Sequence, residues 1–143
     1  MSETRTADIL GIQTATHLYA IGLDRFDPKT AIEAFTDDAV WDASAFGLEL
    51  LGGRDAILAF FERDAAAIAD QYHVITNHVI DFTDDDAATG TNYVVSEGHT
   101  ESGAYFKAVG LNEDTYRLTT DGWKIASRRI SPLIPAEMEG FDA

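Results

Sequence analysis

The sequence predicts a single α+β domain in which three helices are followed by a run of long antiparallel strands. Apolar residues recur at three- and four-residue intervals in the first half of the chain, and they alternate with polar residues from Gln71 onward. The length of 143 residues fits one domain. We expect a cone-shaped α+β barrel with a ligand cavity, a core over about residues 8–131 and an irregular strap over 132–143.

The first helix is expected over residues 6–26, because its apolar side chains recur at helical spacing. Thr6 or Asp8 is expected to cap its start. Its buried face is predicted to hold Ile9, Ile12, Thr16, Tyr19 and Leu23.

A second helix is expected to begin with Asp27 as N-cap and Pro28 at the first helical position. It is expected to include Ala34 and Phe35, to end at 36–38 and to precede a short strand at 39–42. A loop or short strand pair is then expected over 43–53. A third helix is predicted over 54–69, where a run of alanines favours helix.

Four strands are expected in the second half of the chain, because apolar and polar residues alternate there between turn signals. An acidic turn, a glycine-bounded turn at 98–103 and a tight Asp-Gly turn separate them. The predicted strands are 71–83, 87–97, 104–119 and 122–131.

Composition excludes several classes of function. The net charge of −15 argues against binding to nucleic acid or to an anionic membrane surface. The absence of cysteine excludes disulfides and thiolate metal sites. No metal-ligand set or glycine-rich phosphate loop is visible, so we expect no metal and no cofactor. The sequence shows neither a secretory signal nor an apolar run long enough to span a bilayer, so a cytoplasmic protein is expected.

Six short segments carry a family resemblance: 18–27 (LYAIGLDRFD), 35–42 (FTDDAVWD), 52–57 (GGRDAI), 73–77 (HVITN), 114–125 (DTYRLTTDGWKI) and 128–130 (RRI). In this order and spacing they resemble the SnoaL-like family of the nuclear transport factor 2-like superfamily. The resemblance covers about residues 8–131 and implies the cone-shaped fold, a small-molecule ligand and a homodimer or homotrimer. Its members include scytalone dehydratase, bile-acid dehydratases, a hexachlorocyclohexane dehydrochlorinase, ketosteroid isomerases, polyketide cyclases and non-catalytic binders, so fold alone does not name the reaction.

Asp24 and His73 are the leading candidate catalytic residues. His73 interrupts an apolar strand, and Asp24 lies near the end of the first helix. On these two residues alone, a helix-end aspartate and a packed core histidine are the better interpretation. The resemblance implies a dyad, because dehydratase and dehydrochlorinase members pair a helix-end aspartate with a strand histidine. In such a dyad the carboxylate fixes the histidine tautomer and stabilises the imidazolium.

Tyr19 completes the predicted catalytic set, since dehydratase-like members point a tyrosine hydroxyl into the pocket at this position. A packed core tyrosine is the alternative. Asn77 shares the His73 face by strand alternation, whereas His78 is expected on the other face. Asn112 is expected on the inner face of its strand, where Gly110 leaves room for a ligand.

Three further residues complete the predicted substrate-binding set. His99 resembles the second histidine of scytalone dehydratase in its position, but the neighbouring Gly98 and Glu101 favour a solvated turn histidine. Arg129 is preferred over Arg128 for binding a carbonyl or carboxylate group of the substrate. Trp41 is the third.

The leading functional hypothesis is a cofactor-independent, dehydratase-like lyase or an isomerase of small, largely apolar ring substrates. In it, His73 is the acid or base, Asp24 orients it, and Tyr19 with Asn112 polarises the substrate. A polyketide cyclase or ketosteroid-type isomerase with Asp24 or Asp42 as base is the second hypothesis. A non-catalytic small-ligand-binding protein is the third.

Overall fold

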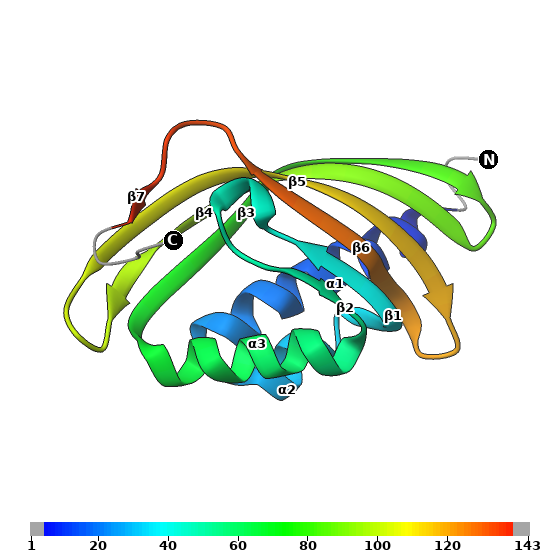
Figure 1. Ribbon diagram of the computed structural model, residues 1–143. Helices are drawn as coiled ribbons and strands as arrows, with labels where there is room; N and C mark the ends of the chain where they lie inside the picture. Colours follow the sequence, from blue (N-terminus) through cyan, green and yellow to red (C-terminus); the bar gives the residue numbers. More distant parts are fainter. Residues whose placement is uncertain (1–4, 139–143) are drawn as a thin grey trace.

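In the computed structural model, which describes residues 5–138, a single curved sheet arches over three helices on its concave side (Figure 1). The helices are α1 (Thr6–Asp24), α2 (Pro28–Ile32) and α3 (Arg54–Ala67), with a short 3₁₀ turn, η2 (Ser44–Phe46). The strands are β1 (Phe35–Asp42), β2 (Leu50–Gly52), β3 (Ile68–Asp84), β4 (Ala87–Thr100), β5 (Tyr105–Thr119), β6 (Gly122–Pro132) and β7 (Glu137–Met138).

The sheet has the strand order β2-β1-β6-β5-β4-β3, and β7 pairs with β5 off this path. Neighbouring strands are antiparallel except β1 and β6, which are parallel. The path ends at β2 and β3, so the sheet stays open. The predicted α+β class and the mostly antiparallel cone are confirmed, and the cone is a strongly curved open sheet.

Four of the five residues predicted for the buried face of α1 are buried, namely Ile12, Thr16, Tyr19 and Leu23, and Ile9 is only partly buried. The predicted N-cap is wrong. Arg5 occupies the cap position without a side-chain cap hydrogen bond. The carboxylate of Asp8, one of the predicted caps, instead accepts a hydrogen bond at 2.9 Å from the indole N–H of Trp123 on β6.

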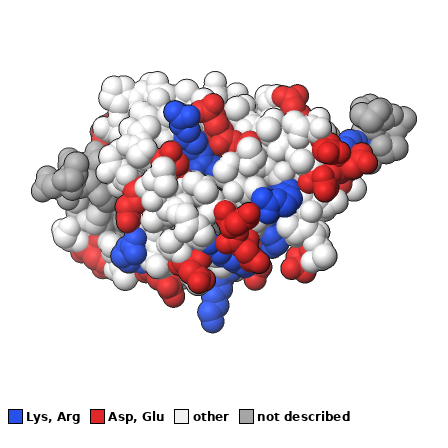
Figure 2. Space-filling view, turned by 45° about the vertical axis from the view of Figure 1, so that its right-hand side comes forward, with Lys and Arg blue, Asp and Glu red and all other residues white. Residues whose placement is uncertain are grey.

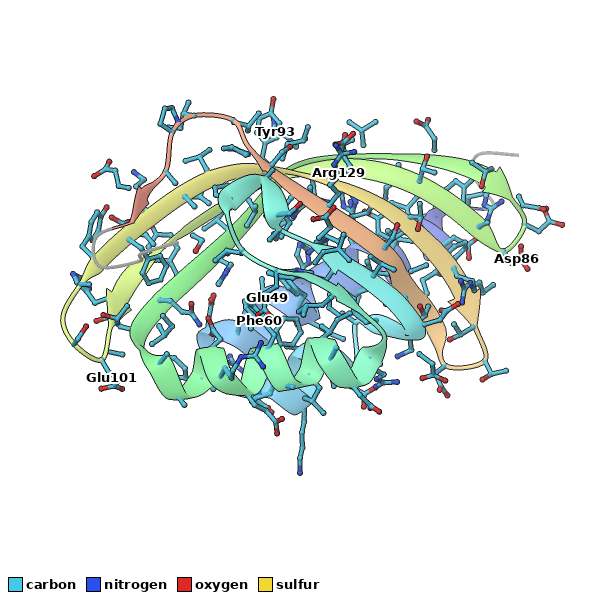
Figure 3. The ribbon with its side chains drawn as sticks, in the orientation of Figure 1. Glu49, Phe60, Asp86, Tyr93, Glu101 and Arg129 are labelled. Atoms are coloured by element: carbon cyan, nitrogen blue, oxygen red, sulfur yellow. The ribbon has the colours of Figure 1, made fainter. Side chains whose placement is uncertain are left out.

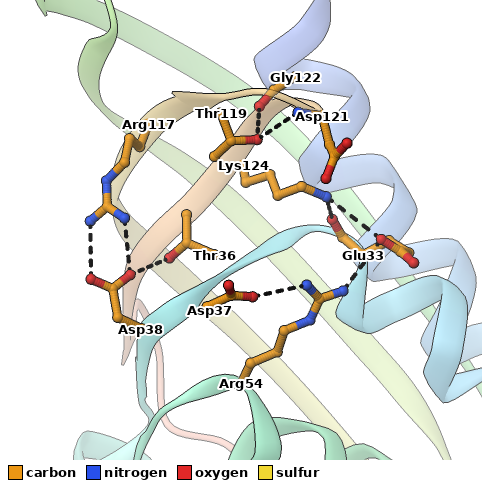
Figure 4. A network of polar contacts seen from close by, with 10 residues as sticks. All are labelled: Glu33, Thr36, Asp37, Asp38, Arg54, Arg117, Thr119, Asp121, Gly122 and Lys124. Carbon is orange, nitrogen blue, oxygen red and sulfur yellow. Dashed lines mark hydrogen bonds and ion pairs between the residues drawn. The ribbon is translucent and has the colours of Figure 1, made fainter.

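Helix α2 begins as predicted, with the Asp27 side chain accepting a hydrogen bond from the Thr30 backbone N–H. It ends at Ile32, however, so the prediction that Ala34 and Phe35 are helical is wrong. Phe35 starts β1, which runs parallel to β6, and the Ala34 carbonyl accepts a hydrogen bond at 2.7 Å from the N–H of a β6 residue. Figure 4 shows the ion pairs and hydrogen bonds that link α2, β1, α3 and the β5–β6 hairpin at this corner of the cone.

Other predicted boundaries change as well. Helix α3 ends at Ala67 rather than 69, and β3 begins at Ile68 rather than 71. Strand β4 continues to Thr100, so the turn expected at 98–103 is shorter. The tail expected to be irregular contains β7, which pairs with Phe106 and Lys107 of β5. Residues 139–143 of the predicted strap lie outside the described residues.

A β-bulge interrupts β3. The pairing register with β4 shifts between Thr76 and Val79. Two residues, Asn77 and His78, therefore lie opposite the single residue Asn92. Asn77 has a φ of 55°, a left-handed conformation that asparagine adopts more readily than most residues.

The bulge reverses the alternation of side chains along β3. Asn77 is exposed, so the expectation that it shares the face of His73 is wrong. The side chain of His78 lies instead on the concave face, where its Nε2 is 2.9 Å from the Tyr116 hydroxyl. Counting alternate residues fails here because it assumes a regular strand.

Candidate active site

Asp24 and His73 meet where the end of α1 approaches β3. Asp24 Oδ1 lies 2.7 Å from His73 Nδ1, and Asp24 Oδ2 accepts a hydrogen bond from the His73 backbone N–H at 3.0 Å. The two side chains are only 21 % and 10 % exposed. One carboxylate therefore holds both the ring and the backbone of His73. This arrangement leaves Nε2 as the ring nitrogen available to the cavity that His73 lines.

The cavity has a volume of about 300 Å³ and lies between the helices and the concave face of the sheet. Its lining is largely apolar. The rings of Trp41 and Phe60 pack together with centroids 4.7 Å apart and form part of one wall. Figure 3 shows Phe60 between α3 and the sheet. Other apolar lining residues include Leu23, Phe46, Val94, Phe106 and Ile130.

Tyr19 lines the cavity beside His73, with ring centroids 6.0 Å apart in an edge-to-face contact. The guanidinium carbon of Arg128 lies 4.8 Å from the Tyr19 ring centroid, on a side chain that does not line the cavity. Burial raises the pKa of Tyr19, and the nearby positive charge of Arg128 opposes this shift. A phenol with a raised pKa remains a hydrogen-bond donor at neutral pH.

Asp64 is a cavity residue that the sequence analysis missed. Its Oδ2 accepts a hydrogen bond at 2.8 Å from the Gln71 amide, which also donates to the Leu23 carbonyl at 3.0 Å. Burial raises the pKa of Asp64, and the Gln71 hydrogen bond and the proximity of His73 oppose the shift. Its position three residues after Phe61 on the apolar face of α3 was the available signal.

The mouth of the cavity carries an ion pair. Arg63 Nη2 of α3 lies 2.8 Å from Glu49 Oε2, in the segment between η2 and β2. Both side chains are slightly more than half exposed. Arg63 also lines the cavity and lies near the Phe60 ring, with the guanidinium carbon 5.6 Å from its centroid. The arginine that lines the cavity is therefore already paired.

Arg128 is the arginine that points inward, so the expectation that favours Arg129 is wrong. The Arg128 side chain is fully buried, and its Nε and Nη2 each donate to Asp114 at 2.8 Å. Arg129 is exposed, and Figure 3 shows it with Tyr93 on the convex side of the sheet. The ion pair with Asp114 decides which arginine of β6 faces inward, because a buried guanidinium needs a buried counter-charge.

Asn112 is buried on the concave face, as expected, but it does not line the cavity. It donates to Asn92 Oδ1 at 2.8 Å, and Asn92 in turn donates to Asp114 Oδ2 at 3.0 Å. The Tyr116 hydroxyl donates to the same Asp114 oxygen at 2.7 Å. Asn112 thus belongs to a buried polar network beside the cavity, whereas Gly110 does line the cavity as expected.

His99 lies outside the cavity. Its side chain is 50 % exposed, and its Nδ1 is 2.9 Å from Asp70 Oδ1 on the neighbouring strand. Asp42 also lies outside the lining, and its Oδ1 accepts hydrogen bonds from the backbone N–H and hydroxyl of Ser44. These bonds hold the pKa of Asp42 below its ordinary value. Of the predicted substrate-binding residues, Trp41 is the one that lines the cavity.

His78 gives the fold a testable pH dependence. Burial lowers its pKa from the ordinary value of 6.5, an effect that Asp114 opposes and Arg128 reinforces. The unfolded chain therefore binds this proton more readily, so His78 stabilises the fold above its unfolded pKa and this contribution is lost as the pH falls through the folded pKa. We expect urea unfolding free energies measured from pH 7.5 to 5 to fall less steeply for His78→Gln than for wild type. Parallel curves would contradict this expectation.

The surface is strongly charged, and Figure 2 shows acidic side chains interspersed with lysine and arginine over one face. Within residues 5–138, no group of three or more histidine, aspartate or glutamate side chains is arranged to hold a metal ion. In the same range, no helix combines the length and apolar character needed to cross a bilayer.

Comparison with known proteins places this chain in a family. A family model of the SnoaL-like domain matches residues 4–129. A "putative aromatic ring hydroxylase" from Novosphingobium aromaticivorans has a similar structure, with 29 % identity and a TM-score of 0.88 over 92 % of this chain and 93 % of that one. No curated protein matches significantly.

Two further structures are similar in fold. A "putative scytalone dehydratase" from N. aromaticivorans has 20 % identity and a TM-score of 0.89, with 100 % of this chain and 95 % of that one covered. The hexachlorocyclohexane dehydrochlorinase LinA-type3 from Novosphingobium barchaimii has 19 % identity and a TM-score of 0.83, with 99 % and 97 % covered. The family match extends over most of the sequence, and the resemblance seen in the sequence is confirmed. The chain belongs to the SnoaL-like domain family.

Proposed function

We propose that the protein is a cofactor-independent lyase of the dehydratase type, or a closely related isomerase, acting on a small and largely apolar ring substrate. The observation that carries this proposal is the hydrogen-bonded Asp24–His73 pair at the wall of an apolar cavity of about 300 Å³. The dehydratase and dehydrochlorinase names of two structural neighbours support the same class of reaction.

In this mechanism His73 Nε2 removes a proton from the carbon next to a carbonyl group. Asp24 keeps the ring oriented and stabilises the imidazolium that forms. The hydroxyl of Tyr19, whose ring packs edge-to-face against the His73 ring, donates to the carbonyl oxygen as negative charge develops on it. A well-placed base of this kind contributes about 10²–10⁴-fold to the rate.

The alternative base Asp42 is less well placed. Its carboxylate caps the η2 turn through Ser44 and lies outside the cavity lining. Asp24 is the other alternative base, but both of its carboxylate oxygens already contact His73, one at the backbone N–H and one at Nδ1. A purely ligand-binding protein with the same cavity would hold ring compounds without turning them over.

An elimination assay tests the proposal. The purified protein is given 3-hydroxycyclohexanone and 3-chlorocyclohexanone, and formation of cyclohexenone is followed by its ultraviolet absorbance. We expect His73→Ala to lower kcat/KM by at least about 10²-fold on every compound that wild type converts. Asp42→Asn should stay within about twofold of wild type. A large loss in Asp42→Asn with an active His73→Ala would support the Asp42 hypothesis, and binding without turnover would support a binding protein.

A further inference from the structure

A second acid lies in the same cavity as the dyad. Asp64 projects from α3 and lines the cavity together with His73. Gln71, which donates a hydrogen bond to Asp64, lies two residues before His73 on the same face of β3. The mechanism proposed above does not use Asp64, although a carboxyl group in an apolar cavity is unusual.

A hydrogen bond, rather than an ion pair, holds the Asp64 side chain in place. The Gln71 amide donates to Oδ2 and is itself anchored to the Leu23 carbonyl at the end of α1. The structure records no ion pair between Asp64 and any lysine or arginine in residues 5–138. Arg63, the adjacent residue, is paired with Glu49 at the cavity mouth.

The groups facing Asp64 act on its pKa in both directions, and the net effect is to raise it. Burial raises its pKa, and the negative charge of Asp24 adds to this effect. The Gln71 hydrogen bond and His73 act in the opposite direction. A buried carboxyl whose pKa is raised is a candidate acid where it shares a cavity with a separate base.

We propose that Asp64 is the general acid of the site and that the natural leaving group is a hydroxyl, which must take up a proton to depart as water. This inference rests on the proposed function and names its substrate class: a neutral β-hydroxy ring ketone. A halide leaves as a stable anion and does not need such an acid. The paired state of Arg63 also disfavours an anionic substrate.

The step balances with the groups that the cavity supplies. His73 Nε2 takes the proton from the carbon beside the carbonyl, and the electron pair of that C–H bond forms the new C=C bond. The C–O bond breaks, and its oxygen takes the Asp64 proton and leaves as water. His73 then holds one extra proton and Asp64 lacks one. Transfer of that proton from imidazolium to carboxylate restores the starting state.

The test compares two leaving groups on one carbon skeleton. Asp64→Asn retains an oxygen that can accept from Gln71, so it removes the acid while conserving the contact. With 3-hydroxycyclohexanone we expect this variant to lose about 10²-fold in kcat/KM. With 3-chlorocyclohexanone, which gives the same cyclohexenone, it should remain within about threefold of wild type. Asp55→Asn, at the exposed start of the same helix, is the matched control and should be unchanged with both.

The pH profile provides a second readout. For wild type, kcat/KM on the hydroxy compound should fall at high pH as Asp64 loses its proton, and this fall should be absent with the chloro compound. Equal losses on both compounds in Asp64→Asn, or conversion of the chloro compound alone by wild type, would overturn the assignment while the Asp24–His73 mechanism stands. Should Asp64→Asn fail to fold, the two wild-type profiles decide the question, and identical profiles count against it. Conversion of neither compound would overturn both proposals.

Discussion

Asp24→Asn is expected to lower kcat/KM by about 10²–10⁴-fold without unfolding the protein, because it should reverse the tautomer of His73. In the wild-type protein, one carboxylate oxygen faces Nδ1 and the other accepts from the His73 backbone N–H. Asparagine offers one oxygen and one NH₂ group. When its oxygen keeps the backbone contact, its NH₂ faces Nδ1 and can only donate. The ring proton then moves to Nε2, which can no longer take a proton from the substrate.

A second aspartate–histidine pair supplies the control for this experiment. Asp70 Oδ1 lies 2.9 Å from His99 Nδ1, but both side chains are at least half exposed and lie outside the cavity. Asp70→Asn should therefore leave kcat/KM within about twofold of wild type. Nitrogen NMR of the histidine rings would report the tautomer of His73 directly. An active Asp24→Asn variant with the proton still on Nδ1 would refute the dyad.

Asp114→Ala is expected to reduce the free energy of unfolding by about 3–5 kcal/mol, because it leaves a buried arginine without its counter-charge. Asp114 accepts two hydrogen bonds from Arg128, one from Asn92 and one from Tyr116. Neither side chain of the Arg128–Asp114 pair is exposed. Equilibrium urea unfolding, monitored by tryptophan fluorescence, measures the loss.

The exposed pair between Arg117 and Asp38, 3.0 Å apart and visible in Figure 4, is the matched control. Asp38→Ala should leave the free energy of unfolding close to that of wild type, because water screens that pair. The double variant Asp114→Leu with Arg128→Met should regain much of the lost stability, since it removes both buried charges. Similar losses for the buried and exposed pairs would mean that the buried charge is not the cause.

Spacing along the sequence predicted the elements whose patterns are local. Helical periodicity identified the buried face of α1, and Asp27-Pro28 identified the start of α2. Alternation predicted the long antiparallel strands. The approach of Asp24 to His73 was an expectation from family resemblance, since no local pattern relates residues 49 positions apart.

The failures arise where distant contacts override a local pattern. The bulge at Asn77 exchanges the faces of two neighbouring residues, and its signal is a single asparagine that tolerates a positive φ. Arg128 points inward because it forms a buried ion pair with Asp114 on another strand. Phe35 is in a strand rather than in the predicted helix because it pairs with β6. Asp64 was overlooked because a lone acid on an apolar helix face resembles a solvated residue.

The polar network next to the cavity constrains how its depth can change in evolution. Gly110 and Ile130 line the cavity, and the next inward-facing residues on their strands are Asn112 and Arg128. Replacing either of these alone with a smaller apolar residue would leave its buried hydrogen-bonding partners unpaired. A lineage that needs a deeper pocket must therefore exchange several residues of the network together. Residues of the apolar walls can instead change one at a time. Among relatives we therefore expect the shape of the cavity opening to vary gradually and the depth of the cavity to vary in large steps.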